Sequence, residues 1–146
     1  MIKFWVPGTP VAKGSAKAFY HKTAHKIVTM QDNRDKQKPW ASMISYCAQE
    51  AGCCLSPAAI QIRLAFVMPR PKSHYGTGKN AATLKRFVPS YHTSKPDLDK
   101  LIRCVKDALT GVAWKDDSQV CEVVADKKYG ETPGVNVEIE EALASF

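Results

Sequence analysis

The hydrophobic positions of this chain alternate in some stretches and follow a helical period in others. Residues 2–6 predict an opening strand, which ends at the turn-forming stretch "PGTP". In residues 59–69 apolar and polar side chains alternate, and this pattern predicts a strand with one buried face. Two closing strands are predicted over residues 119–129 and 135–142.

Two other stretches repeat their apolar residues at helical spacing, which predicts two helices. The first stripe consists of Trp40, Met43, Ile44, Cys47 and Ala51. Pro39 fits the first turn of this helix, where its missing N–H costs nothing, and Gly52 supplies a stop. The second stripe consists of Leu98, Leu101, Ile102, Val105 and Leu109. This second helix is predicted to end near Gly111.

Two basic segments lack a clear period. Residues 11–26, "VAKGSAKAFYHKTAHK", predict a flexible loop or a hairpin, with "HKIVTM" as the returning strand. Residues 69–92 carry five Lys and Arg and predict a mobile loop that faces DNA, because loops of this length in compact domains are usually functional or disordered. The order of elements predicts one α+β domain over residues 1–146, with a mixed sheet packed by two helices.

Composition narrows the class of protein. An apolar content of 45% is that of a folded domain. No apolar run approaches the ~20 residues that span a bilayer, and the N-terminus lacks a signal-peptide core, so we expect a cytoplasmic protein without a membrane partner. The five cysteines form no CxxC pair and are most simply reduced thiols.

The net charge of +7 conceals an asymmetry along the chain. Residues 1–95 contain fifteen Lys and Arg against three Asp and Glu, whereas residues 96–146 contain six against eleven. A basic surface favours nucleic acid, because neutralising phosphates releases counterions. A basic surface that serves solubility alone is the alternative.

Four aspartates surround the second predicted helix: Asp97, Asp99, Asp116 and Asp117. In the structural interpretation Asp97 caps the helix, Asp99 interacts with the helix dipole, and the later pair forms an acidic turn. In the functional interpretation the strand after the helix returns one of the pair to the helix N-terminus. Converging carboxylates would require a cation, and hard oxygen ligands select Mg²⁺ or Mn²⁺. A metal site on a basic protein suggests hydrolysis of phosphodiesters.

The stretch "KPDLDKLIRCVKDALTGVAWKDDSQV", residues 95–120, resembles the signature of the RusA family of Holliday-junction resolvases. That signature runs P-D-x-D-N-L-x-K, then D-A-L-N-G, then a segment like D-D-S-Q-V. The opening "VPGTPVAKGSAK" is similar to the family's N-terminal element, and "FVMPRPKSH" to its middle strand and turn. The resemblance implies a homodimeric, Mg²⁺-dependent endonuclease, often carried by phages, that nicks four-way DNA junctions symmetrically.

The resemblance also assigns roles to residues. The family's catalytic and metal-binding aspartates fall on Asp97, Asp99 and Asp117, and Asp116 is a neighbour that assists the metal site. Two positions depart from the pattern. Lys100 stands where the family usually has Asn, and Arg103 stands where it has a functional Lys. Arg103 keeps the charge but does not readily donate a proton.

The cationic helper is therefore expected to be Arg103, with Lys100 or Lys106 as alternatives. The cations expected to contact DNA are Lys13, Lys17, Arg70, Lys72, Lys79, Lys85, Arg86, Lys100 and Lys106. Two other functions stay open at this point. One is a DNA-binding protein that recognises branched structure without cutting it, and the other is a nuclease for other branched or flapped DNA.

Overall fold

The computed structural model describes residues 1–14, 16–21, 26–31 and 34–143, with the backbone alone for residues 16–21, 26–31 and 34. The strands are β1 (Ile2–Pro7), β2 (Ala16–His21), β3 (Lys26–Gln31), β4 (Ile60–Met68), β5 (Val120–Tyr129) and β6 (Gly134–Glu141). The helices are α1 (Arg34–Glu50) and α2 (Leu98–Leu109). Three short 3-10 turns lie at η1 (Lys72–His74), η2 (Gly78–Asn80) and η3 (Asp117–Gln119).

The main sheet has four strands in the order β1-β6-β4-β5. β6 pairs antiparallel with both β1 and β4, whereas β4 and β5 run parallel, so the sheet is mixed as the sequence predicted. The parallel pair exists because α2 crosses over between β4 and β5. This crossover makes β5 an edge strand that lies close to α2.

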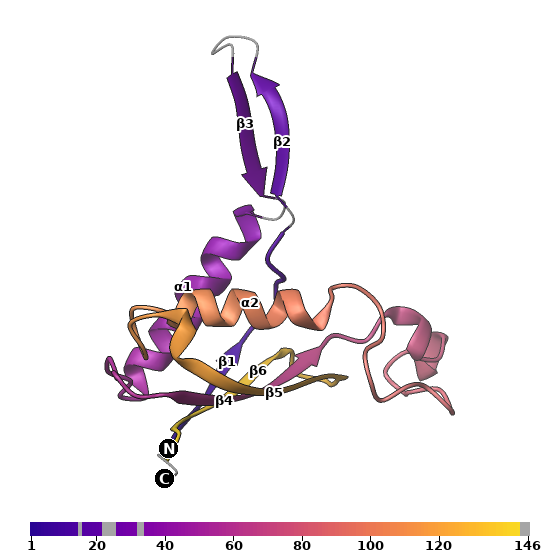
Figure 1. Cartoon of the computed structure of the whole chain (residues 1–146). Helices are drawn as coiled ribbons and strands as arrows, with labels where there is room; N and C mark the ends of the chain where they lie inside the picture. Colours follow the sequence, from indigo (N-terminus) through magenta and orange to yellow (C-terminus); the bar gives the residue numbers. More distant parts are fainter. Residues whose placement is uncertain (15, 22–25, 32–33, 144–146) are drawn as a thin grey trace.

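Both helices cover one face of the sheet, and Figure 1 shows no helix of the described residues on the other face. β4 turns every second side chain toward the helices, from Ile60 to Met68, and all five of these are buried. The side of α2 that meets them contains the buried residues Leu101, Cys104, Val105 and Leu109. The predicted α+β domain is confirmed, and its core is this single layer between helices and sheet.

The first helix starts earlier than its apolar stripe predicted. α1 begins at Arg34, so Pro39 lies inside the helix and not in its first turn. Asp35, Lys36 and Lys38 are exposed, and Trp40 is the first buried residue among those of α1 whose burial is described. The additional turn therefore rests on no core, and a pattern of buried positions could not reveal it.

Two basic segments project from this body (Figure 1). β2 and β3 form a separate two-stranded antiparallel sheet, which settles the choice between loop and hairpin in favour of the hairpin. Residues 69–92, here named the basic arm, contain η1 and η2 and a bridge between Tyr75 and Leu84. The predicted loop thus has a hydrogen-bonded structure of its own.

Within the described residues no helix combines the length and apolar character needed to cross a membrane.

The buried face of α2 predicts a clear effect of truncation. Leu101→Ala should lower the free energy of unfolding by about 2–5 kcal/mol, because Leu101 is fully buried and its loss leaves a cavity. Leu84→Ala is the matched control: Leu84 is 45% exposed on the basic arm, and its loss should cost less than about 0.5 kcal/mol. Chemical denaturation measures both values. Equal losses would mean that α2 does not pack as described.

Candidate active site

α2 separates a buried face from a charged face. Its exposed side contains Asp99, Arg103 and Asp107, with Lys106 half-buried beside them. Asp99 and Arg103 are four residues apart and therefore lie above one another on the helix surface. The helix thus presents a stripe of both charges to solvent while its other side anchors it on the sheet.

Asp97 occupies the N-cap position of α2 with an extended backbone, φ −69° and ψ 142°. Its side chain nevertheless makes no capping hydrogen bond, so the interpretation of Asp97 as a side-chain cap is wrong. The carboxylate is exposed, with the ammonium of Lys100 at 3.9 Å. Its oxygens therefore remain available at a helix N-terminus, which favours negative charge and ionised carboxylates.

The segment that delivers Asp97 is held by a lysine that the sequence motifs did not indicate. The Lys127 ammonium donates to the carbonyl oxygens of Ser94, at 2.6 Å, and Pro96, at 2.7 Å. The Lys127 carbonyl in turn accepts from the backbone N–H of His92 at 3.1 Å. The end of β5 therefore fixes the backbone directly before Asp97. Strand alternation predicted only that residues of β5 take opposite faces, and could not show this contact.

His92 is buried at the same junction. Its Nε2 lies 3.4 Å from the Ser94 hydroxyl, and its ring packs edge-on against Tyr129. Burial lowers the pKa of His92, and the nearby positive charge of Lys127 lowers it further. The imidazole is therefore a neutral packing element at neutral pH and adds no positive charge beside Asp97.

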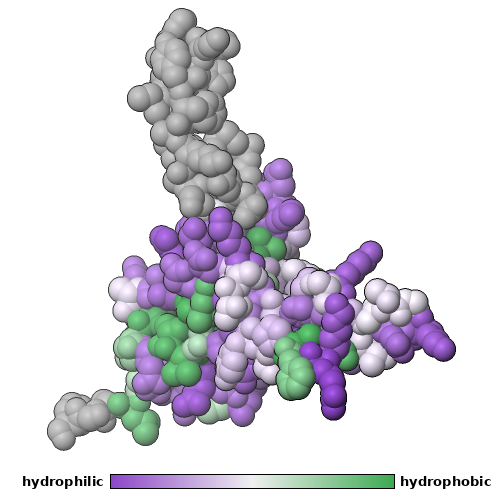
Figure 2. All heavy atoms as spheres, turned by 90° about the vertical axis from the view of Figure 1, so that its right-hand side faces the viewer, coloured by the Kyte–Doolittle hydropathy of each residue, from purple (hydrophilic) through white to green (hydrophobic). Residues whose placement is uncertain are grey.

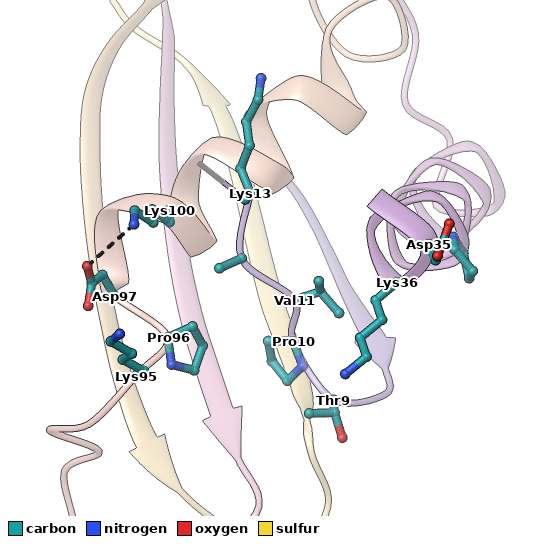
Figure 3. A pocket seen from close by; sticks show the side chains of 13 residues that line it. Thr9, Pro10, Val11, Lys13, Asp35, Lys36, Lys95, Pro96, Asp97 and Lys100 are labelled. Carbon is teal, nitrogen blue, oxygen red and sulfur yellow. Dashed lines mark ion pairs between the residues drawn. The ribbon is translucent and has the colours of Figure 1, made fainter. Parts of the chain in front are cut away.

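Asp97 lies at one wall of a groove of about 900 Å³ (Figure 3). The groove is formed by the N-terminal segment 9–14, the start of α1 and residues 95–100. Its charged lining residues are Lys13, Asp35, Lys36, Lys95, Asp97 and Lys100. In Figure 3, Lys36 reaches from α1 toward the N-terminal segment, and Lys100 pairs with Asp97. The sequence motifs did not indicate Lys36 or Lys95, because only the fold brings them into the same groove as Asp97.

Lys13 lines this groove, but its side chain pairs with Asp107, which lies outside the lining. Its ammonium is 2.5 Å from Asp107 Oδ2, and its backbone N–H donates to the Lys100 carbonyl at 3.1 Å. Lys13 therefore joins the N-terminal segment to α2 as well as contributing charge to the groove. Lys17, the other cation predicted from that region, belongs to β2, and its side chain lies outside the described residues.

The two adjacent aspartates at the start of β5 have different tasks. Asp116 accepts a hydrogen bond from the Ser118 backbone N–H at 2.8 Å, and the Asp116 N–H donates to the Gln119 side chain. These hydrogen bonds form a capping box, and the one from Ser118 lowers the pKa of Asp116. Asp117 takes no part in it. Its Oδ2 lies 3.3 Å from the Lys106 ammonium and therefore faces α2.

Asp97 lies at the N-terminal end of α2, whereas Asp117 contacts Lys106 in the last turn of this helix. Among the described residues, no three His, Cys, Asp or Glu side chains come close enough together to hold a metal ion. β5 runs antiparallel to α2, with Asp117 beside Lys106 near one end and Lys127 beside Pro96 at the other. Lys106 lies nine positions after Asp97, which is a rise of about 13 Å along the helix axis. The strand thus returns Lys127, and not Asp117, to the N-terminus of α2.

The basic arm divides its cations into two kinds. Arg70 is half-buried, lies 5.1 Å above the Tyr129 ring and donates to the Pro89 carbonyl at 2.8 Å. Its guanidinium therefore ties the two ends of the arm together. The four other predicted contacts, Lys72, Lys79, Lys85 and Arg86, are exposed.

Residues 7–140 match the family model described as endodeoxyribonuclease RusA. The chain belongs to the RusA family of endodeoxyribonucleases. It is also 31% identical over 145 residues to the uncharacterized protein YqaN of Bacillus subtilis (strain 168), and this match covers 98% of each chain. The family membership that the residue 95–120 signature indicated is confirmed, whereas the roles of the individual RusA-type residues stay predictions.

The different tasks of the two adjacent aspartates predict different stability effects. Asp116→Ala should lower the melting temperature, because the Ser118 N–H loses its acceptor, whereas Asp117→Ala should change it little. The pKa of Asp116 is lowered from 3.8 in the folded state, so its stabilisation is present above that value and is lost as the pH falls through the folded pKa. The gap between the wild-type and Asp116→Ala melting temperatures should therefore be constant above about pH 5 and shrink at lower pH.

Thermal unfolding followed by circular dichroism measures this gap for both variants across the same pH series. A larger loss in Asp117→Ala than in Asp116→Ala would reverse the assignment of the pair.

Proposed function

We propose that this RusA-family protein is a homodimeric, divalent-metal-dependent endonuclease of the cytoplasm, which resolves four-way DNA junctions by paired nicks in recombination and repair. The observation that carries the proposal is the uncapped, exposed carboxylate of Asp97 at the wall of a groove with four lysines. Lysines bind phosphates as point charges, and a carboxylate beside them has no purpose in simple phosphate binding.

Carboxylate oxygens are the ligands that hard cations prefer. Among the described residues of one chain, however, no three such side chains are close enough together to hold a metal ion. Asp97, Asp99 and Asp117 are exposed, and none of them is used in a capping hydrogen bond. Mg²⁺ or Mn²⁺ bound by such oxygens would supply an activated water and stabilise the charge that develops on the phosphate. Asp116 is a weaker candidate ligand, because one of its oxygens already accepts from Ser118.

A second copy of the chain would supply the third carboxylate ligand for the proposed metal ion. β5 is an edge strand, and in the described chain its outer edge is paired only near Lys128, by Tyr91. Val123 and Val124 lie in the unpaired part and are 37% and 48% exposed. An exposed apolar strand edge is a template for pairing with another strand. We propose that two copies join antiparallel along this edge, about a two-fold axis between the two valines.

Antiparallel pairing would correct the separation found in one chain. It brings the Asp117 end of one β5 beside the end of β5 in the other copy, where Lys127 holds the segment that leads to Asp97. Each site would then combine Asp97 and Asp99 of one copy with Asp117 of the other. Two such sites related by the two-fold axis suit two symmetric nicks.

The remaining charged side chains have roles that follow from their places. Lys127 holds the backbone before Asp97, and Lys100 balances the Asp97 carboxylate. Arg103 lies one turn after Asp99 on the exposed side of α2, where its guanidinium would bind a phosphate through two parallel hydrogen bonds. We therefore prefer Arg103 to Lys106 as the cationic helper, because Lys106 already faces Asp117.

The proposal predicts complementation between inactive variants. Asp97→Asn, Asp99→Asn and Asp117→Asn should each abolish cleavage of a labelled four-way junction while leaving binding intact, because each removes a ligand and a negative charge but keeps the shape. A heterodimer of Asp97→Asn and Asp117→Asn, purified through two different tags, should then contain one intact site of two and make one nick per junction.

The control heterodimer pairs Asp97→Asn with Asp99→Asn. Both substitutions fall in the same half of a shared site, so each of its two sites keeps one defect and it should stay inactive. An inactive Asp97→Asn and Asp117→Asn heterodimer would place all three ligands in one chain. Near-normal cleavage by any single variant would remove that residue from the site, and binding without cleavage by the wild type would favour the non-catalytic alternative.

A further inference from the structure

Phe87, on the basic arm, combines two unfavourable features. Its side chain is 98% exposed, which makes it the most exposed large hydrophobic residue of the described chain. Its backbone φ is +62°, and it is the one described residue other than glycine with a positive φ. A left-handed conformation is strained for a bulky side chain, because its Cβ approaches the neighbouring carbonyl oxygen. Neither feature stabilises the fold, and strain of this kind is a reason to look for a function of the residue.

The arm holds this ring in a defined place. The Lys85 N–H donates to the His74 carbonyl and the Gly76 N–H to the Thr83 carbonyl, each at 2.9 Å, which joins the two sides of the arm. Gly76 is required there, because a Cβ would meet the Asn80 backbone oxygen at 2.7 Å. On the other side of Phe87, the Pro89 carbonyl accepts from Arg70. Phe87 therefore stands between two anchored points.

The surroundings of the ring favour a polyanion. Residues 69–92 contain five Lys and Arg and no Asp or Glu, and Lys85 and Arg86 directly precede Phe87. Both of these cations are exposed. The face of the molecule toward which the arm projects carries hydrophilic residues interspersed with hydrophobic patches (Figure 2). An aromatic ring among cations is the arrangement that stacks on a base while the neighbouring phosphates are neutralised.

The arm also lies near the end of α2 at which Asp97 is placed. It connects β4 to the segment that leads into Asp97, and in Figure 1 it projects beside the N-terminal end of α2. In a linear duplex both faces of each internal base are stacked. At a branch point the stack is interrupted, and base faces become accessible to a side chain.

We propose that Phe87 stacks on the face of a base at the branch point and so helps the protein to distinguish branched from linear DNA. This inference rests on the proposed function. Lys85 and Arg86 then contact the phosphates that flank that base. Phe87 is a specificity-determining residue in this account and takes no part in the hydrolysis.

Three variants test the proposal by equilibrium binding to a four-way junction and to a matched linear duplex. Phe87→Ala should bind the junction on the order of tenfold more weakly, the effect of losing one stacked base, and bind the duplex unchanged. Phe87→Trp should retain junction affinity. Phe87→Gly should lose it as Phe87→Ala does, yet melt at the wild-type temperature or above it, because glycine accepts a positive φ. Leu143→Ala, which removes another side chain that is 93% exposed, is the control.

The contact itself is tested by removing bases from the DNA. Junctions with an abasic site at each nucleotide next to the branch point should include one that weakens wild-type binding on the order of tenfold and leaves Phe87→Ala binding unchanged. If every abasic site weakens junction binding equally in the wild type and in Phe87→Ala, the ring contacts none of these bases and the proposal is overturned. Normal junction binding by Phe87→Gly would also overturn it. If the wild type itself does not prefer the junction, the proposed function fails first.

Discussion

α2 connects β4 to β5 and packs on the face of the sheet, and this packing fixes where the charged groups along the helix lie. Leu101, Val105 and Leu109 seal one side of this helix against the sheet, and β5 returns antiparallel along it. The helix is therefore a rigid spacer of about 18 Å with carboxylates near both ends. It separates Asp97, at its N-terminus, from Lys106 in its last turn, which Asp117 contacts, and this separation is the reason for proposing a site shared between two chains.

This constraint also explains why the neighbouring cations are arranged as they are. Lys100 lies beside Asp97 and Lys106 beside Asp117, so each separated carboxylate has a lysine near it. Exposed pairs of this kind contribute little stability, typically about 0–1 kcal/mol. Weak pairs of this kind are easily rearranged by a competing ligand, as the proposed site requires. The buried side of α2 contributes most of the stability that this helix provides, whereas the charged residues of its exposed side are those proposed to take part in the reaction.

The sequence predicted those parts of the fold that depend on periodic burial. The alternation of β4 and the stripe of α2 gave both elements and the α+β class, and the residue 95–120 motif gave the family. Periodicity could not reveal the start of α1, because the turn before Pro39 touches no core. Nor could it reveal Lys127, Lys36 or Lys95, since their positions depend on contacts between segments that are distant in the sequence.

The aspartates show the same limit most clearly. Motif spacing placed Asp97 and Asp117 on one site, but spacing along a chain does not give the direction in which β5 runs beside α2. Only the fold shows that the strand delivers Lys127 to the helix N-terminus. The difference in role between Asp116 and Asp117 likewise depends on the capping box, which requires the positions of Ser118 and Gln119 in space.

The central claim is that a divalent metal and the α2 carboxylates cut branched DNA. The most direct measurement incubates the purified wild-type protein with an end-labelled four-way junction or the matched linear duplex, in Mg²⁺ or in EDTA. The account predicts paired nicks in the junction with Mg²⁺, an intact junction with EDTA, and an intact duplex in both. Equal cutting of junction and duplex, or cutting of the junction in EDTA, would contradict it.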